Sequence, residues 1–91
     1  MISVRPESGL DRNKVTRYIE EHNIQTRLLF SGNLIKHPCF DQIRETGAYR
    51  VMGDLNNTEF IMNNTFWVGV YPGMTDEKID YMAKVIKEIM K

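Results

Sequence analysis

The chain has 91 residues, of which 42% are hydrophobic and 26% charged, and its 12 Lys and Arg balance 12 Asp and Glu. This size and composition indicate one small globular domain, and the lack of net charge argues against nucleic acid or a membrane surface as a partner. The single cysteine, Cys39, cannot form an internal disulfide. No apolar run approaches the roughly 20 residues that span a bilayer, and the N-terminus lacks the apolar core of a signal peptide. We therefore expect a cytoplasmic protein.

The N-terminal third predicts a strand followed by a helix. The segment 2–6 is partly alternating and ends at a proline, which is typical of a short strand. Asp11 is a good N-cap for a helix over residues 12–22, and Asn23 is a reasonable stop. The apolar face of this helix carries Val15 and Ile19, with Tyr18 and His22 on its flank.

The next segment, residues 24–30, has the period-two pattern of a half-buried strand. One face would carry Ile24, Thr26, Leu28 and Phe30, and the other Gln25, Arg27 and Leu29. Ser31-Gly32-Asn33 breaks the pattern, so the strand should end there.

The middle of the chain is mixed. Pro38 favours the first position of a short helix, and a loop should follow through Gly47 and Gly53. A second short helix is expected within residues 57–64, with Asn57 or Thr58 near its cap.

Residues 65–71, TFWVGVY, predict a strand whose nearly continuous apolar character indicates cover on both faces. Gly69, in mid-strand, would allow close approach of a neighbouring element or a ligand. The following Tyr71–Met74 fits a type II turn, in which Gly73 takes the positive φ.

The last helix has the clearest pattern. Thr75 caps it, and acidic residues follow at the positive end of its dipole. Its apolar stripe comprises Ile79, Met82, Ala83, Ile86, Ile89 and Met90. The whole order predicts an α+β fold of about three antiparallel strands with helices over one face. The other face of such a sheet must meet water or another body.

Few side chains indicate chemistry. His37 and Cys39 lack further ligands at metal-site spacing, and Cys39 lacks a base, so we expect a small buried residue there. His22 is expected to be structural. Arg27 is the exception, because a guanidinium fixed on a strand can bind a carboxylate or a phosphate. A structural ion pair explains it equally well.

Two blocks carry a family resemblance: IQTRLLFSGNLIKHPCF and YRVMGDLNNTEFIMNNTFWVGVYPGMTDEKIDYM. They resemble the C-terminal part of the CDP-4-dehydro-6-deoxyglucose 3-dehydrases, which belong to the DegT/DnrJ/EryC1 group of pyridoxal-phosphate sugar enzymes. The similarity runs from about Ile2 to Ile89. It implies the small C-terminal domain of the aspartate aminotransferase fold, here as a fragment of residues 1–91 that starts inside the first strand of that domain.

The resemblance implies that the parent removes the C3 hydroxyl of a CDP-linked 4-keto-6-deoxy sugar with pyridoxamine phosphate, and that some members hold a [2Fe-2S] cluster. Cofactor and cluster residues would belong to the large domain, so the fragment would carry neither and would be inactive alone. Its partners would be that large domain and the CDP-sugar, in a homo-oligomeric parent.

Leu29-Phe30 stands where aminotransferase relatives carry a His-Tyr pair, which favours the dehydrase branch. The residues implied to line the substrate edge are Arg27, Phe30, Ser31, Gly32 and Asn33. Two alternatives remain: the same domain of a nucleotide-sugar aminotransferase, or a free-standing, non-catalytic binding module with this fold.

Overall fold

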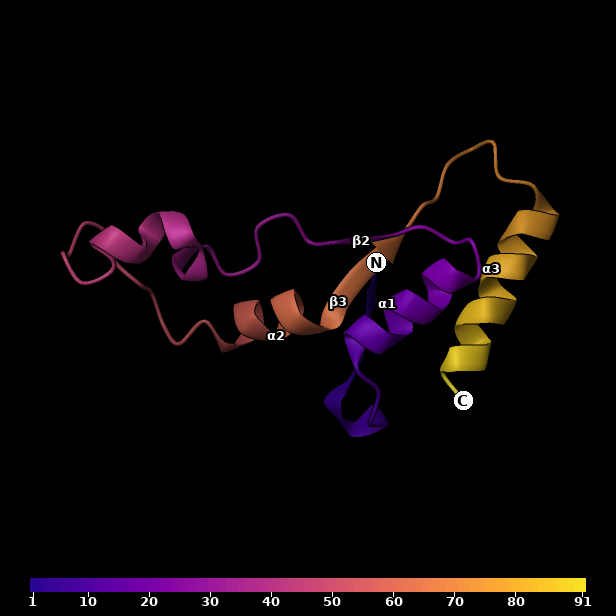
Figure 1. Ribbon diagram of the computed structural model, residues 1–91, viewed down its shortest axis with the longest axis horizontal. Coiled ribbons are helices and arrows are strands. Elements are labelled where there is room, and N and C mark those ends of the chain that lie inside the picture. Colours follow the sequence, from indigo (N-terminus) through magenta and orange to yellow (C-terminus); the bar gives the residue numbers. More distant parts are fainter.

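The computed structural model describes residues 1–91 (Figure 1). The strands are β1 (Ile2–Ser3), β2 (Thr26–Leu28) and β3 (Thr65–Val68), and the helices are α1 (Arg12–Glu21), α2 (Asn56–Asn64) and α3 (Asp76–Ile89). Short 3₁₀ turns lie at Pro6–Ser8, Leu34–Lys36 and Pro38–Ile43. The predicted α+β class and order of elements are confirmed.

The three strands form one antiparallel sheet in the order β1-β3-β2, so the last strand in the chain is the central one. Phe66 on β3 lies opposite Ile2 on one side and Leu28 on the other. Because neighbours across a sheet point to the same face and neighbours along a strand to opposite faces, Phe66 and Trp67 face opposite sides.

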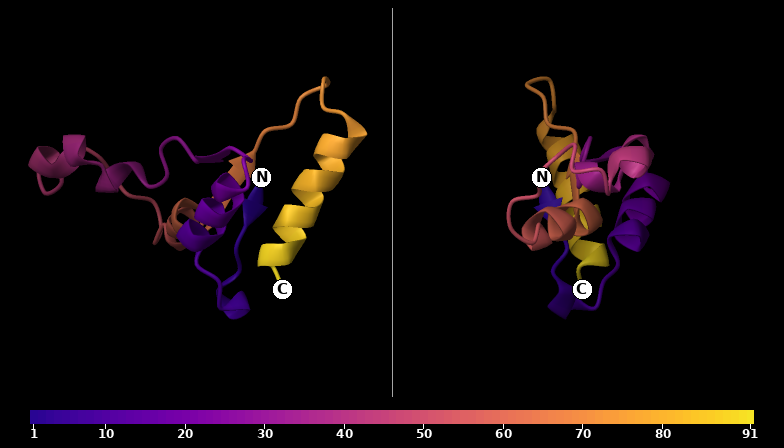
Figure 2. Two further views of the ribbon diagram at one scale, coloured as in Figure 1. Left: turned by 45° about the vertical axis from the view of Figure 1, so that its right-hand side comes forward. Right: turned by 90° about the vertical axis from the view of Figure 1, so that its left-hand side faces the viewer.

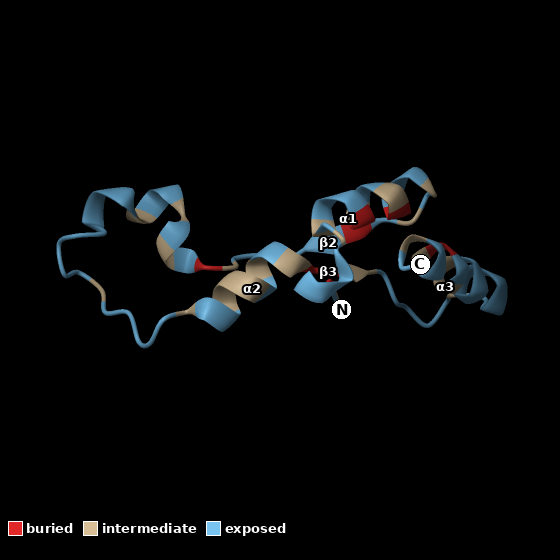
Figure 3. Ribbon diagram, turned by 90° about the horizontal axis from the view of Figure 1, so that it is seen from below, coloured by how far each residue is buried: buried red, intermediate tan, exposed pale blue.

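The face that carries Phe66 is the one that the helices cover. Phe66 is 0% exposed, and its core cluster has four further members, contributed by the N-terminal segment, α1 and α3: Val4, Val15, Ile19 and Val85. Most of the buried parts of the ribbon lie where α1 and α3 approach the sheet, and one further buried stretch lies on the connection beside α2 (Figure 3). Helices over one face were predicted, and the structure confirms them.

Local signals explain both ends of α1. The Asp11 carboxylate accepts a hydrogen bond from the Lys14 amide at 2.9 Å, which satisfies one of the free N–H groups of the first turn. At the other end Asn23 has a φ of 61°, and the amide of Ile24 bonds back to the carbonyl of Ile19 at 3.2 Å. This left-handed stop confirms the predicted helix to within one residue.

Helix α3 is confirmed, with Thr75 as its N-cap, but its buried line differs from the predicted stripe. Val85 is the residue that enters the core, whereas Ile79 and Met90, at the two ends of the stripe, are exposed. The middle of the predicted stripe is partly buried, at Met82, Ala83, Ile86 and Ile89, and Val85 is the core residue that the prediction missed. Spacing alone did not determine which side of a broad apolar face would be covered.

Helix α2 begins one residue earlier than predicted. Leu55 occupies the N-cap position with a φ of 56° and no side-chain cap, so Asn57 and Thr58 lie inside the first turn. The carboxylate of Asp54 accepts the amide hydrogen of Asn56 at 3.0 Å instead. Asn57 and Thr58 therefore lie near the cap, as predicted, and the side chain that bonds the first helical amide is that of Asp54.

Strand β3 ends at Val68, so Gly69 lies beyond the strand rather than in its middle. A Cβ atom placed on Gly69 would meet nothing within 4 Å, and Val70 is exposed. The predicted close approach at Gly69 and the predicted cover on both faces are therefore not found within residues 1–91. The helical layer covers only the Phe66 face of the sheet.

The turn after β3 is present but is not type II. The amide of Met74 bonds to the carbonyl of Tyr71 at 3.1 Å, which closes a β-turn, yet Gly73 does not have a positive φ. A Cβ atom on Gly73 would lie 3.1 Å from the Tyr71 ring. At this position a larger residue would crowd the Tyr71 ring, and the turn does not use the left-handed backbone that glycine allows.

Residues 34–55, which we call the arm, extend away from the body of the domain (Figures 1 and 2). The molecule measures 53 × 31 × 21 Å, and its radius of gyration is 16.8 Å, against about 12 Å for a compact chain of this length. No arm residue is buried. Cys39, expected to be buried, is exposed because no second layer covers its 3₁₀ turn.

Strand β2 is shorter than the predicted 24–30. Thr26 is buried as expected, but Leu28 is exposed and Phe30 is 87% exposed. The period-two pattern continues past the end of the strand, whereas the cover from α1 and α3 does not.

No helix has both the length and the apolar character needed to cross a membrane.

Candidate functional site

The five residues expected at a substrate edge lie on β2 and on the loop that leads from it to the arm. Arg27 is exposed on β2, and Phe30 and Ser31 are exposed on the loop. Gly32 is partly covered, and Asn33 is only 4% exposed. Three of the five, Arg27, Phe30 and Ser31, therefore lie where a ligand can reach them. Asn33 instead attaches the loop to α2.

The exposed sheet face is built around Trp67. Arg27 lies directly opposite Trp67 across the β2–β3 ladder, and the ring of Phe30 meets the indole edge-on with centroids 5.5 Å apart. The indole Nε1 donates to the carbonyl of Leu28 at 3.2 Å, which fixes the ring against β2. We call Arg27, Phe30 and Trp67 the open face.

Arg27 has no carboxylate partner. The chain's ion pairs are Lys36 with Glu59 and Arg44 with Asp41, and no hydrogen bond involves the Arg27 side chain. The structural ion pair considered for Arg27 is therefore not formed within residues 1–91. A guanidinium beside an aromatic pair is suited to bind an anionic group bidentately.

Arg27 also borders a groove of about 530 Å³ between the start of β2, the β3–α3 connection and α3. Tyr71 and Tyr81 contribute aromatic surface, and Lys78 contributes a second cation. Volumes of this size are common among small-molecule sites. None of the four loop residues lines this groove, so it adjoins the predicted edge rather than coinciding with it.

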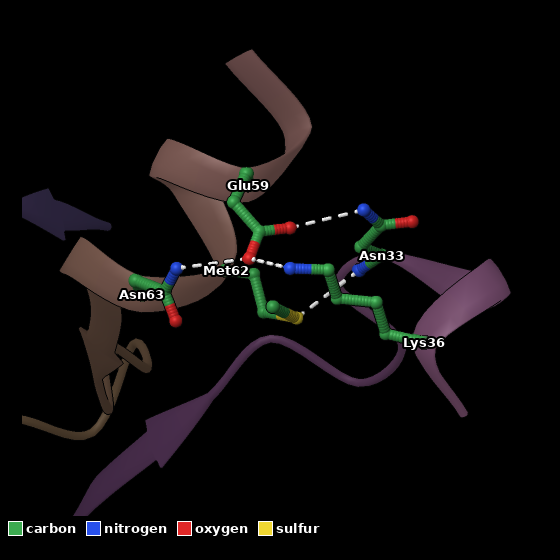
Figure 4. Close-up of polar contacts among 5 residues, drawn as sticks. All are labelled: Asn33, Lys36, Glu59, Met62 and Asn63. Carbon is green, nitrogen blue, oxygen red and sulfur yellow. Dashed lines mark hydrogen bonds and ion pairs between the residues drawn. The ribbon is translucent and has the colours of Figure 1, made fainter. Parts of the chain in front are cut away.

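Helix α2 holds the loop through one carboxylate (Figure 4). Glu59 accepts from Asn33 Nδ2 at 3.0 Å and from Asn63 Nδ2 at 3.4 Å, and it pairs with Lys36 at the base of the arm. The hydrogen bond from Lys36, followed by that from Asn33, lowers the pKa of Glu59 from its ordinary value. Glu59 is thus the meeting point of loop, arm and α2.

Gly32 is required at its position for two reasons. Its φ is 59°, a left-handed conformation, and an added Cβ would lie 2.4 Å from Cγ of Met62 on α2. The sulfur of Met62 also accepts the amide hydrogen of Asn33 at 3.3 Å. The loop therefore lies directly on α2 at this point.

Sequence reasoning did not select Trp67, Glu59 or Met62 as site residues. Trp67 had a usable signal, because alternation along β3 places it on the face opposite a core residue. Glu59 and Met62 had none, since their contacts join segments 26 and 29 residues apart. His37 has a local role, in which its Nε2 contacts the carbonyl of Ser31.

Comparison with known proteins gives a family match. The model of the DegT/DnrJ/EryC1/StrS aminotransferase family matches residues 1–87. The chain is 45% identical over 87 residues to the lipopolysaccharide biosynthesis protein RfbH of Salmonella typhimurium, covering 96% of this chain and 19% of that protein.

Two further relatives are named as dehydratases. The dTDP-4-dehydro-2,6-dideoxy-D-glucose 3-dehydratase of Saccharopolyspora spinosa is 43% identical over 89 residues, which is 98% of this chain and 18% of that protein. The GDP-4-keto-6-deoxy-D-mannose 3-dehydratase of Escherichia coli O55:H7 is 24% identical over 84 residues, or 92% of this chain and 21% of that protein. The chain spans about a fifth of the length of these relatives.

Proposed function

The chain belongs to the DegT/DnrJ/EryC1/StrS aminotransferase family, and on that premise we propose that it is the small C-terminal domain of a nucleotide-sugar 3-dehydrase. The observation that carries the proposal is the match to two named 3-dehydratases along 98% and 92% of this chain. The reaction is removal of the C3 hydroxyl of a nucleotide-linked 4-keto-6-deoxyhexose in deoxysugar and O-antigen biosynthesis. We propose CDP as the carrier, on the resemblance of the two sequence blocks.

The cofactor proposed for the parent is pyridoxamine phosphate, which supplies electron withdrawal next to C3. The residues of this chain do not form a cradle for it. The three buried polar side chains are already bonded within the chain: Thr26 to Glu20, Asn33 to Glu59 and Thr65 to Ser3. None of the three lines the groove. We therefore place the cofactor site in the remainder of the parent.

A [2Fe-2S] cluster belongs to the same remainder if the parent has one. Such clusters are usually held by four cysteine thiolates, and this chain contributes one cysteine in all. Absorbance of the purified parent between about 400 and 600 nm, with iron and sulfide analysis, tests this part of the proposal.

The open face is the part of this domain that we propose for substrate contact. Arg27 supplies a cation for a phosphate of the nucleotide sugar, and Phe30 and Trp67 supply flat apolar surface for a base or sugar ring. Ser31 and Gly32 contribute the adjoining loop backbone. The free guanidinium and the edge-on aromatic pair support this assignment.

The domain's other proposed partner is the large domain of the same parent. Exposed apolar side chains on the arm and beyond β3 support such a contact, among them Leu34, Met52 and Val70. We further propose a homo-oligomeric parent, which light scattering of the full-length protein tests.

The experiment is a substrate panel. The full-length protein that contains residues 1–91 is incubated with pyridoxamine phosphate and CDP-, dTDP- or GDP-linked 4-keto-6-deoxyhexose, and the products are identified by mass spectrometry. We expect loss of the C3 hydroxyl with the CDP-sugar and none with residues 1–91 alone. Turnover of another nucleotide only would refute the CDP assignment, and no C3 loss with any of them would refute the proposed reaction.

One alternative has its own support, because the matched family is described as aminotransferases. An aminotransferase would replace the 4-keto oxygen by an amino group from glutamate and would retain the C3 hydroxyl. The same mass spectra distinguish the two reactions. A free-standing binding module would instead bind a nucleotide sugar as residues 1–91 without converting it.

A further inference from the structure

The loop Phe30–Asn33 has little support from its own backbone. Outside the helices and strands, no backbone-to-backbone hydrogen bond involves residues 29–32. Side-chain contacts therefore hold the loop. Two come from α2, namely Gly32 against Met62 and Asn33 on Glu59, of which the second is drawn in Figure 4. A third is the contact of His37 Nε2 with the carbonyl of Ser31. The contact with Met62 limits how close the loop can come to α2, and the hydrogen bond to Glu59 attracts the loop to it.

The Glu59 contact is the directional one. Asn33 is 4% exposed, so its side-chain amide has little access to bulk water, and the Glu59 carboxylate is its hydrogen-bond partner. Hydrogen bonds to an ionised acceptor are shorter and stronger than neutral ones. Lys36 and Asn63 hold the same carboxylate from the other side, which limits its rotamers.

We infer that Glu59 is a positioning residue: its carboxylate fixes the conformation of the loop Phe30–Asn33 through Asn33, and thereby sets the substrate edge of the open face. Glu59 itself points to the loop and the arm and does not lie on the open face. The link to substrate rests on the proposed function, whereas the control of the loop does not.

A purely stabilising ion pair is the competing explanation, and it predicts a different result. If only the Lys36 contact mattered, Glu59→Gln and Lys36→Met would act alike, lowering stability without changing the KM. If the Asn33 contact matters, Glu59→Gln loosens the loop more than Lys36→Met does. Glutamine retains an acceptor oxygen, but it lacks the charge that strengthens the bond from Asn33. Lys36→Met retains the contact between Asn33 and a charged carboxylate.

The test uses the full-length protein that contains this chain, with hydrogen–deuterium exchange and steady-state kinetics on the same samples. We expect Glu59→Gln to speed exchange of the hydrogen-bonded amides of Asn33, Lys36 and His37 about tenfold, with α1 unchanged. The KM for the nucleotide sugar should rise about tenfold, with kcat within twofold. Lys36→Met should change the exchange rate and the KM by less than about threefold each. Glu45→Gln, whose exposed carboxylate has no partner, is the matched control.

The outcomes separate the two proposals. Unchanged exchange at Asn33, Lys36 and His37 in Glu59→Gln would overturn the inference, as would an equal effect of Lys36→Met. Faster exchange with a fall in kcat alone would overturn the link to substrate binding. If the wild-type protein removes no C3 hydroxyl, the proposed function fails, and the exchange data still decide whether Glu59 controls the loop.

Discussion

Arg27 and Trp67 lie opposite each other on β2 and β3, on the sheet face that no helix covers. Their neighbours on the covered face are Thr26 and Phe66, which are buried. One strand pair therefore carries the core on one side and an aromatic and cationic surface on the other. The covered face of the sheet stabilises the fold, and the open face is the one proposed to contact the substrate.

Replacement of Arg27 tests the open face. Arg27→Gln in the full-length protein should raise the KM for the nucleotide sugar about 10- to 100-fold, because a charge-assisted hydrogen bond is worth about 1.5–3 kcal/mol. The melting temperature should not fall, since the side chain has no partner to lose. Arg17→Gln on α1, also exposed, is the control. An unchanged KM would remove Arg27 from the site.

Replacement of Phe66 tests the core. Phe66→Ala should lower the free energy of unfolding by about 3–5 kcal/mol, because a fully buried ring leaves a cavity. A chain of 91 residues is expected to have only about 5–14 kcal/mol in total. Urea denaturation measures the loss. Phe30→Ala is the matched control: with its ring 87% exposed, it should cost under about 0.5 kcal/mol.

Replacement of Gly32 tests the approach of the loop to α2. Gly32→Ala combines a left-handed φ with a clash against Met62 and should cost about 2–4 kcal/mol. Gly9 has a similar φ of 69° but open space around it, so Gly9→Ala should cost only about 1–2 kcal/mol. The difference between the two variants isolates the contact with Met62. Equal losses would show that α2 does not constrain the loop.

The role of Glu59 also has a pH signature. Its pKa is lowered in the folded chain, so the unfolded state takes up the proton first as the pH falls. The stabilisation from Glu59 should be complete above its ordinary pKa of 4.5 and should disappear as the pH falls through the lower folded value. Urea denaturation of wild type and Glu59→Gln should therefore differ at pH 7 and converge once the pH lies below the lowered pKa of Glu59. A constant difference would contradict this account.

Sequence reasoning succeeded where the determinants were local. Asp11 and Asn23 define the ends of α1 within one stretch of chain, and Thr75 marks the start of α3. It failed where a distant element decided the outcome. Val85 enters the core because α3 meets α1 on that side, a choice that the spacing of apolar residues leaves open.

The candidate site was predictable to a similar extent. Arg27 stood out because a guanidinium fixed on a strand can bind a carboxylate or a phosphate, and the break at Ser31-Gly32-Asn33 located the loop. The attachment of that loop was not visible, since Asn33 and Glu59 are 26 positions apart in the chain, with the arm between them. At Cys39 the prediction itself was wrong: cysteine is a residue type that is often buried, but this one lies exposed on the arm.

Isotope labelling at one oxygen tests the assignment most directly. The full-length protein would be given CDP-4-keto-6-deoxyglucose carrying ¹⁸O in its C3 hydroxyl, with pyridoxamine phosphate, and mass spectrometry would follow the label. Our account predicts that the label leaves the sugar and is recovered in water. A product that keeps the ¹⁸O and gains an amino group in place of the 4-keto oxygen would contradict it.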